Sequence, residues 1–249
     1  MVQCSRSQSR LYGHVRCLTL AVKVASYTHL MEWQILGSFG GSSPTCRMTS
    51  FLINGELALD AGSITQVLPL EPGMRVLDAG CGSGRNLVYF LMQGYDVFGV
   101  DTDPQAVERT RRLAASLAPA LPADNFRLEA IEEMTFPDAF ADLVLSSAVL
   151  HFARCDDHFE AMLRATWRVL KPGGLLFCRL ASSIGMERQV QRLAGRRFLL
   201  PDGSQRYLVD EDLLLRFTAE LGGQLADPLK TTIVQNQRCM TTWIVRKNA

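Results

Sequence analysis

The sequence predicts an α/β fold with a doubly wound, seven-stranded, mostly parallel sheet that ends in an antiparallel hairpin. Apolar stretches alternate with stretches of helical periodicity, a pattern typical of parallel strands joined by crossover helices. A glycine-rich turn at 80–84 lies directly between an apolar strand and an apolar helical run. Near the end, two apolar segments flank a short polar turn, which predicts the hairpin.

The alternation assigns each element in order. Strands are expected near 75–78, 96–100, 125–129, 141–146 and 175–179, and the hairpin at 231–235 and 240–245. Helices are expected near 62–68, 85–93, 104–118, 156–170 and 210–221. Residues 181–209 exceed what a simple connection needs, with a helix expected over 186–193 and a turn at 201–204. Extra segments of this kind commonly cover a substrate, so this insert is predicted to be a lid.

The first expected strand ends at Asp78 and breaks into Gly80-x-Gly82-x-Gly84. Glycines adopt positive φ and let a ligand lie against bare backbone. The helix that follows directs free N–H groups and its positive dipole end to the same place. A dinucleotide-binding loop would place its third glycine where Arg85 stands. The loop therefore favours a ligand with a negative or strongly accepting group, other than a dinucleotide.

The string Val-Leu-Asp-Ala-Gly-Cys-Gly-Ser-Gly-Arg-Asn at 76–86 resembles motif I of class I S-adenosylmethionine-dependent methyltransferases. The turn Leu-Lys-Pro-Gly-Gly at 170–174 is similar to another mark of that family, and the resemblance extends over about 71–180. It implies that S-adenosyl-L-methionine is the cofactor, with acceptors near its ammonium and N–H groups near its carboxylate. The residues that it implies in this loop are Asp78, Ala79, Gly80, Cys81, Gly82, Gly84 and Asn86.

The second expected strand ends in Asp101, about twenty residues after the loop, as for an acid that binds ribose hydroxyls. We expect Asp101 and the adjacent Thr102 to contact the cofactor. Asp103 precedes Pro104, which is the pattern of an N-cap and first helical residue. Capping is therefore the preferred role of Asp103.

The segment after the third strand departs from the family pattern. The family often places an acid there for the adenine amino group, but the alignment puts Ala130 at that position. Backbone groups around Ile131, or Glu129 after a small shift, are the two alternatives.

The fourth strand ends near Ser146 and leads to His151, at the expected mouth between methyl donor and acceptor. Its sequence lacks the Asn/Asp-Pro-Pro-aromatic motif of DNA and glutamine N-methyltransferases, so the resemblance is to the small-molecule branch. His151 is the one candidate general base there, and a histidine that only shapes the cavity is the favoured alternative. No metal is expected, because His151, Cys155 and His158 find no matching ligand elsewhere. Five arginines are each either solvated lid charges, the favoured reading, or contacts to an anionic acceptor: Arg179, Arg188, Arg192, Arg196 and Arg206.

Composition limits the partners. The chain has 249 residues, 26 basic and 25 acidic side chains and a formal charge of +1, without a long basic run. Nucleic-acid binding normally needs a basic stripe, and no apolar run reaches membrane-spanning length. A small-molecule acceptor is expected, without nucleic acid or membrane; the acceptor's identity and the oligomeric state stay open. The seven cysteines lack paired spacing, which fits a reducing, cytoplasmic compartment.

Residues 1–47 differ from the rest, since 1–31 contain arginines and serines but no acid. They predict an N-terminal extension without order, either a mitochondrial transit peptide, which would imply the mitochondrial matrix, or an artefactual start before Met48. Residues 48–249 are the expected methyltransferase domain, with the lid insert at about 181–209. Two alternative functions stay open: a nicotinamide-dependent oxidoreductase and a non-catalytic domain that binds S-adenosylmethionine.

Overall fold

A computed structural model describes residues 52–53, 56–57, 71 and 73–249. The predicted N-terminal extension and the helix expected at 62–68 lie outside the described residues. Two short strands, β1 (Leu52–Ile53) and β2 (Glu56–Leu57), pair in antiparallel fashion.

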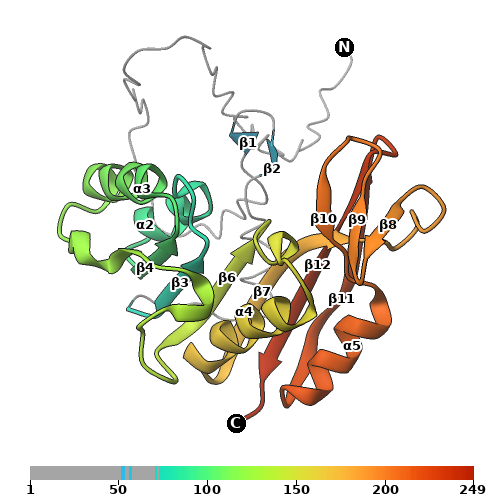
Figure 1. The fold of residues 1–249 in the computed structure, drawn as a ribbon. Helices are drawn as coiled ribbons and strands as arrows, with labels where there is room; N and C mark the ends of the chain where they lie inside the picture. The colour runs from blue at the N-terminus through green and yellow to red at the C-terminus, as the bar shows by residue number, and fades with distance from the viewer. Residues whose placement is uncertain (1–51, 54–55, 58–70, 72) are drawn as a thin grey trace, which may run out of the picture. The chain divides into compact units, whose positions relative to one another are not determined.

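The main sheet has seven strands in the order β11-β12-β7-β6-β3-β4-β5 (Figure 1). Strands β3 to β7 pair in parallel, whereas β12 is antiparallel to both β7 and β11. The predicted sheet with its terminal hairpin is therefore confirmed. The strands are β3 (Arg75–Ala79), β4 (Asp96–Asp101), β5 (Phe126–Leu128), β6 (Ala141–Ser147), β7 (Leu170–Ser182), β11 (Gly223–Val234) and β12 (Arg238–Lys247).

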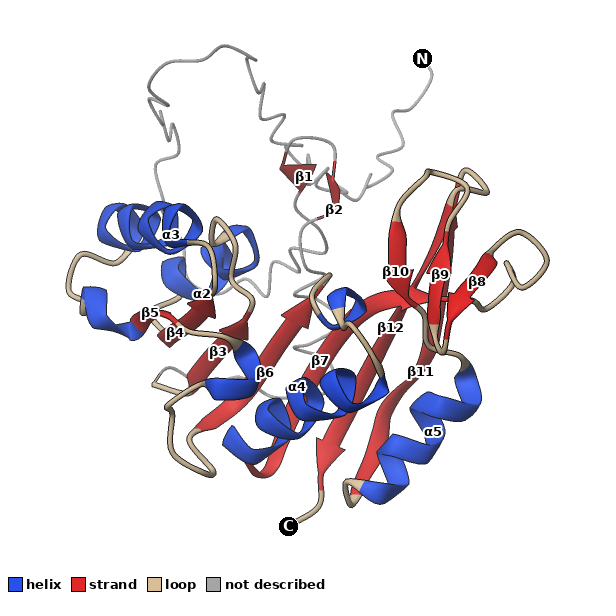
Figure 2. Ribbon diagram, viewed as in Figure 1, coloured by secondary structure: helices blue, strands red, loops and turns tan. Residues whose placement is uncertain are grey.

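Helices connect these strands as the sequence predicts (Figure 2). They are α2 (Val88–Met92), α3 (Pro104–Leu117), α4 (Asp156–Val169) and α5 (Glu211–Glu220), with short 3₁₀ turns η1 (Arg85–Leu87), η2 (Ala123–Asn125), η3 (Ile131–Glu133) and η4 (Leu150–Phe152). Asp103 caps α3, because its side chain accepts a hydrogen bond from the Gln105 N–H at 2.9 Å. Asp210 caps α5 in the same way by accepting from the Leu213 N–H at 2.9 Å.

Both faces of the sheet are buried. In β6, Leu143 and Leu145 belong to the cluster that packs against α2 and α3, while Val144 belongs to the cluster against α4 and α5. Successive side chains of a strand point to opposite faces, so this division means that helices cover each side. The same burial makes the strands almost continuously apolar.

One connection differs in detail from the expectation. Strand β7 begins at Leu170, five residues earlier than predicted, and its pairing with β6 shifts from Ala141–Leu170 to Leu143–Leu175. The extra residues, 171–174, form an irregularity in which Gly173 has a φ of 76°. The predicted turn is thus present as a bulge at the start of a longer strand.

The helix expected at 186–193 is wrong. Residues 191–207 instead form a three-stranded antiparallel sheet of β8 (Gln191–Ala194), β9 (Arg197–Leu199) and β10 (Gln205–Tyr207). Met186 is buried at 1% exposure, but Leu193, seven residues later and on the same face of a helix, is 44% exposed, so the apolar residues do not share one buried helical face. The predicted turn at 201–204 is confirmed as the connection between β9 and β10.

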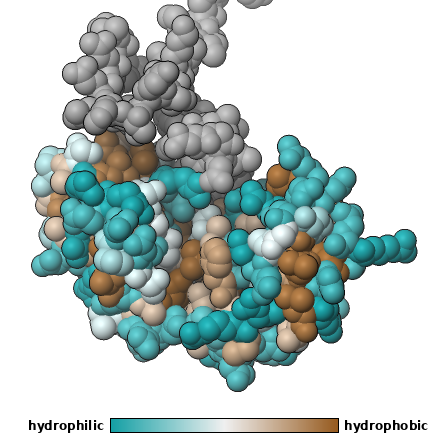
Figure 3. All heavy atoms as spheres, turned by 45° about the horizontal axis from the view of Figure 1, so that its top comes forward, coloured by the Kyte–Doolittle hydropathy of each residue, from teal (hydrophilic) through white to brown (hydrophobic). Residues whose placement is uncertain are grey.

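Much of the described surface in Figure 3 is hydrophilic, interrupted by separate apolar patches. Among the described residues, large exposed apolar side chains are few: Met92, Leu128, Phe152, Leu193, Leu215, Leu225 and Ile233. Within the part of the chain that the structure covers, no helix is long and apolar enough to cross a membrane.

Candidate active site

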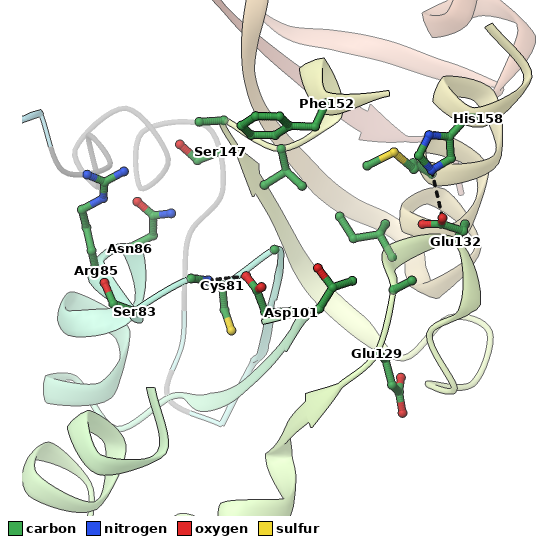
Figure 4. Close-up of a pocket in the computed structure, with 18 of the residues that line it drawn as sticks. Cys81, Ser83, Arg85, Asn86, Asp101, Glu129, Glu132, Ser147, Phe152 and His158 are labelled. Carbon is green, nitrogen blue, oxygen red and sulfur yellow. Dashed lines mark hydrogen bonds and ion pairs between the residues drawn. The ribbon is translucent and has the colours of Figure 1, made fainter. Parts of the chain in front are cut away.

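A cleft of about 700 Å³ opens where β3, β4 and β6 end (Figure 4). The crevice beyond the carboxyl ends of parallel strands is the usual ligand site of such sheets, and the volume is typical of a small-molecule site. One side of the cleft follows β3 and β4: Gly80, Cys81, Gly82, Ser83, Arg85, Asn86, Asp101 and Thr102. The other side follows β5 and β6: Glu129, Ala130, Ile131, Glu132, Ser147, Ala148, Val149, Phe152, Arg154, His158 and Met162.

The glycines of the loop have separate reasons to lack a side chain. Gly80 has a φ of 92°, and a Cβ there would lie 2.4 Å from Val149 Cγ2. Gly84 has a φ of 78°, and a Cβ there would lie 2.9 Å from Leu113 Cδ2. The first glycine therefore lets the loop pack against the opposite wall of the cleft, and the last lets it pack against α3. Gly82, with a φ of 54°, faces open space.

Asp101 is held in a fixed orientation by two backbone groups. Its Oδ2 accepts a hydrogen bond from the Gly82 N–H at 2.8 Å (Figure 4). Its Oδ1 accepts one from the Asp103 N–H at 2.9 Å. Each carboxylate oxygen can accept a further bond. Two hydroxyls of a ribose would fit these acceptors, and that contact stays a prediction.

Asp78 lies beneath the loop, fully buried, and does not line the cleft. Its Oδ2 is 3.5 Å from Asn86 Nδ2, and its Oδ1 has no hydrogen-bond partner among the described residues. Burial raises the pKa of Asp78 to about 8; the Asn86 bond opposes that rise, and the Asp101 carboxylate adds to it. Direct contact between Asp78 and a ligand is therefore a poorer reading than contact through Asn86, which does line the cleft.

The predicted site residues divide into two groups. Seven line the cleft: Gly80, Cys81, Gly82, Asn86, Asp101, Thr102 and Ile131. Five do not line it and are buried: Asp78, Ala79, Gly84, Ser146 and His151. The second group lies behind the cleft surface. Strand-end residues such as Asp78 and Ser146 are covered by the loops that follow them. Ser146 Oγ, like Asp78 Oδ1, is buried without a partner among the described residues.

The geometry of His151 opposes the role of general base. The ring is 6% exposed, and its Nδ1 accepts a hydrogen bond from the Ala181 N–H at 3.1 Å. The remaining proton of a neutral ring then lies on Nε2, so no ring nitrogen is left to take a proton. Burial lowers the pKa of His151 to about 4, with smaller contributions from Arg206, Arg179 and Arg238. His151 supports the wall of the cleft from behind.

The expected adenine end contains a pair that sequence reasoning missed. His158 Nε2 lies 2.9 Å from Glu132 Oε1 (Figure 4). His158 Nδ1 accepts a hydrogen bond from the Arg154 N–H at 3.1 Å. Glu129 is engaged elsewhere, because its carboxylate accepts from the Thr135 N–H at 2.8 Å and the Thr135 hydroxyl at 2.7 Å. The shift that would bring Glu129 to an adenine would break both bonds. Nothing in the sequence signals the Glu132–His158 pair.

The cleft-lining residues from Ser147 to Arg154, here called the wall after β6, also include a strained residue that sequence reasoning missed. Ala148 has a φ of 63°, a conformation that is unfavourable for alanine, and it lines the cleft. Its N–H donates to the Arg179 carbonyl at 2.7 Å, which ties the wall to β7. The bend turns the chain from β6 across Gly80 toward Phe152, a ring that is 57% exposed.

The residues on the first side of the cleft fit S-adenosylmethionine. Loop glycines of positive φ give a close approach to backbone, Asp101 presents free acceptors, and Asn86 joins the cleft to the unsatisfied Asp78 carboxyl. Among the described residues, no group of three metal-ligating side chains gathers at this cleft or elsewhere.

Comparisons with known proteins agree with this geometry. Residues 77–178 match the family model described as a methyltransferase domain. An uncharacterized methyltransferase of Bacillus subtilis, YodH, is 34% identical over 122 residues, 49% of each chain. A malonyl-[acyl-carrier protein] O-methyltransferase of Serratia marcescens is 34% identical over 129 residues, covering 51% of this chain and 44% of the relative. The alignment thus spans about half the length of these curated relatives.

A solved structure supports the fold alone. The 1,6-didemethyltoxoflavin N1-methyltransferase of Burkholderia thailandensis, with its substrate and S-adenosylhomocysteine bound, superposes with a TM-score of 0.55 at 21% identity over 72% of each chain. Residues 77–178 therefore match a methyltransferase domain by sequence, and the described fold is similar to that of a methyltransferase solved with S-adenosylhomocysteine bound. The nicotinamide-dependent alternative finds no support in these matches.

Proposed function

We propose that this protein transfers a methyl group from S-adenosylmethionine to a small-molecule acceptor by in-line displacement. The observation that carries the proposal is the Asp101 carboxylate, fixed by the Gly82 and Asp103 N–H groups beside a glycine loop that lines the same cleft. The matched methyltransferase domain supports the methyl transfer, and the 1,6-didemethyltoxoflavin N1-methyltransferase of similar fold supports a small-molecule acceptor.

The sulfonium of S-adenosylmethionine supplies an activated methyl group when it is bound. The work left to the protein is to hold the acceptor in line with that methyl and to exclude water. The loop after β3 and Asp101 would position one reactant. The wall after β6, with Val149 packed on Gly80, would position the other at a fixed distance. His158 lines the same side of the cleft, but both of its ring nitrogens are engaged, Nε2 with Glu132 and Nδ1 with the Arg154 N–H, so the fit is best with an acceptor that needs little general-base help.

The location, the partners and the domain bounds of the protein are part of the same proposal. We place the protein in the cytoplasm, or in the mitochondrial matrix if residues 1–47 act as a transit peptide, with a small-molecule acceptor and without nucleic-acid or membrane partners. The domain would comprise residues 48–249, and the insert at about 181–209, with its three-stranded sheet, would act as the lid. Deletion of 185–205 should reduce acceptor affinity and turnover; unchanged values would contradict the lid.

The test has two stages. Calorimetric titration with S-adenosylhomocysteine should give saturable binding, and radiolabelled S-adenosylmethionine should then label at least one member of a broad small-molecule panel. Absence of binding to folded protein would refute the proposal. Binding without any labelled product would favour the non-catalytic alternative, and a shift of the melting temperature by a nicotinamide cofactor alone would favour the oxidoreductase.

A further inference from the structure

The wall of the cleft after β6 combines an exposed aromatic ring with positive charge. Phe152 lines the cleft, and its side chain is 57% exposed. The guanidinium of Arg206, from β10, lies over this ring with Cζ 4.8 Å from the centroid. An apolar surface and a cation are therefore presented together where an acceptor would enter.

Further arginines surround the same wall. Arg154 lines the cleft two residues after Phe152. Arg179 pairs with Ser147 in the β6–β7 register, and its carbonyl holds the Ala148 N–H at 2.7 Å. The charges of Arg206, Arg179 and Arg238 all act on buried His151, whose pKa they help to lower. Four arginines from four separate segments thus make the region around the wall positive.

The carboxylates near these arginines are mostly engaged elsewhere. Asp202 feels Arg238 and Arg206, but it accepts from the Ser204 N–H at 2.9 Å and from the Ser204 hydroxyl at 2.6 Å. Glu132, which feels the charge of Arg154, is paired with His158. Among the described residues, no carboxylate lies at ion-pair distance from either Arg206 or Arg154.

Arg196, which lies in the same insert as Arg206, differs from it in having a carboxylate partner. Its guanidinium lies 2.7 Å from the Asp210 carboxylate, so its charge is already balanced. Arg206 has no carboxylate at ion-pair distance among the described residues, and its guanidinium lies instead over Phe152, which lines the cleft. A guanidinium can bind a carboxylate or a phosphate through two parallel N–H donors.

We propose that the acceptor is an anion, with an apolar or aromatic body that lies on Phe152 and an oxyanion group that Arg206 and Arg154 bind. This inference rests on the proposed function and specifies its substrate class. Carboxylate and phosphate share the chemistry that these arginines recognise, and the experiment distinguishes them. Arg206 and Arg154 are then residues that determine acceptor specificity.

The test compares charged and neutral probes on protein saturated with S-adenosylhomocysteine. Calorimetry would measure the binding of cinnamate, of phenyl phosphate and of neutral cinnamamide. At least one of the two anions should bind about tenfold or more tightly than the amide, since hydrogen bonds to charged groups are the strong ones. The preferred anion identifies carboxylate or phosphate as the group that the wall accepts.

Matched variants locate the effect. Arg206→Gln should abolish the preference for the anion, and Arg154→Gln should reduce it. Arg192→Gln is the control, because its guanidinium belongs to the same small sheet but lies 5.3 Å over the Phe198 ring rather than over Phe152, which lines the cleft, so the preference should persist. Affinity for S-adenosylhomocysteine should be unchanged in all three variants.

Equal affinity for the amide and both anions would overturn the inference. Equal losses of the anion preference in Arg206→Gln and Arg192→Gln would also overturn it. These failures differ from failure of the proposed function. A protein that binds S-adenosylhomocysteine but shows no preference for anions refutes only the acceptor class. A folded protein that does not bind S-adenosylhomocysteine refutes the methyltransferase assignment itself.

Discussion

The loop after β3 and the wall after β6 line one cleft but are built in opposite ways. The loop side is nearly continuous in sequence, at 80–86 and 101–102, and presents mainly backbone around one fixed carboxylate. The wall side joins Phe152 and Arg154 to Arg206, about fifty residues away in sequence. A side made of contiguous backbone suits a ligand that never varies. A side made of side chains from distant segments can change its specificity without disturbing that ligand.

The largest effect should come from Asp101 on the loop side. Replacement of Asp101 by alanine removes a charged acceptor of two expected hydroxyl bonds and frees the Gly82 N–H. S-adenosylhomocysteine should bind at least about 100-fold more weakly, because each hydrogen bond to a charged group contributes strongly. Calorimetry measures this directly.

Asp103→Ala is the matched control for that variant. Asp103 lies two residues away and caps α3 through the Gln105 N–H. Its loss should lower the free energy of unfolding by about 1 kcal/mol with little change in affinity. Equal losses of affinity in the two variants would remove the special role of Asp101.

The next effect tests whether the wall side contains a base. His151→Ala leaves the buried Ala181 N–H without its acceptor and should lower the free energy of unfolding by about 1–3 kcal/mol. His151→Asn keeps an acceptor oxygen and should recover part of that loss. The pH dependence of methyl transfer should be the same in both variants as in the wild type. A variant of unchanged stability, in which the rate falls and a pH break disappears, would instead show that His151 is a base.

The last effect concerns Asp78, which lies beneath the loop and does not line the cleft. Its pKa is about 8 in the folded protein against 3.8 as the ordinary value, so the folded state holds a proton that the unfolded state has released between these limits. Its contribution to stability is fully present below pH 3.8 and is lost as pH rises through about 8. The steepest loss is about 1.4 kcal/mol per pH unit.

Urea unfolding between pH 5 and about pH 9 would measure this contribution by comparing wild type with Asp78→Asn. The asparagine variant lacks the titrating group, so its stability relative to wild type should increase as pH rises. A difference that does not vary with pH would mean that Asp78 is ionised in the folded state. The methyl-donor side would then hold a buried negative charge rather than a neutral acid.

Local patterns were enough to predict most of the fold. The strands that contain Val76, Val144 and Trp243 are almost continuously apolar because both faces of the sheet are buried. A sheet covered by helices on both sides requires this pattern. The glycine loop could be predicted because positive φ and close backbone approach restrict the residue type at each position. The helix expected at 186–193 was wrong because its apolar residues carry no information about whether they are buried, and Leu193 is exposed.

The sequence by itself determined the β–loop–α unit at 75–92 and the position of Asp101, since both depend on neighbours within a few residues of one strand end. Only the tertiary structure decided that Asp78 and His151 lie behind the cleft, that Glu132 pairs with His158, and that Arg206 covers Phe152. These relations join segments 26 residues or more apart, as the Glu132–His158 pair illustrates. Contacts of that kind are set by the packing of whole elements, and no local spacing in the sequence encodes them.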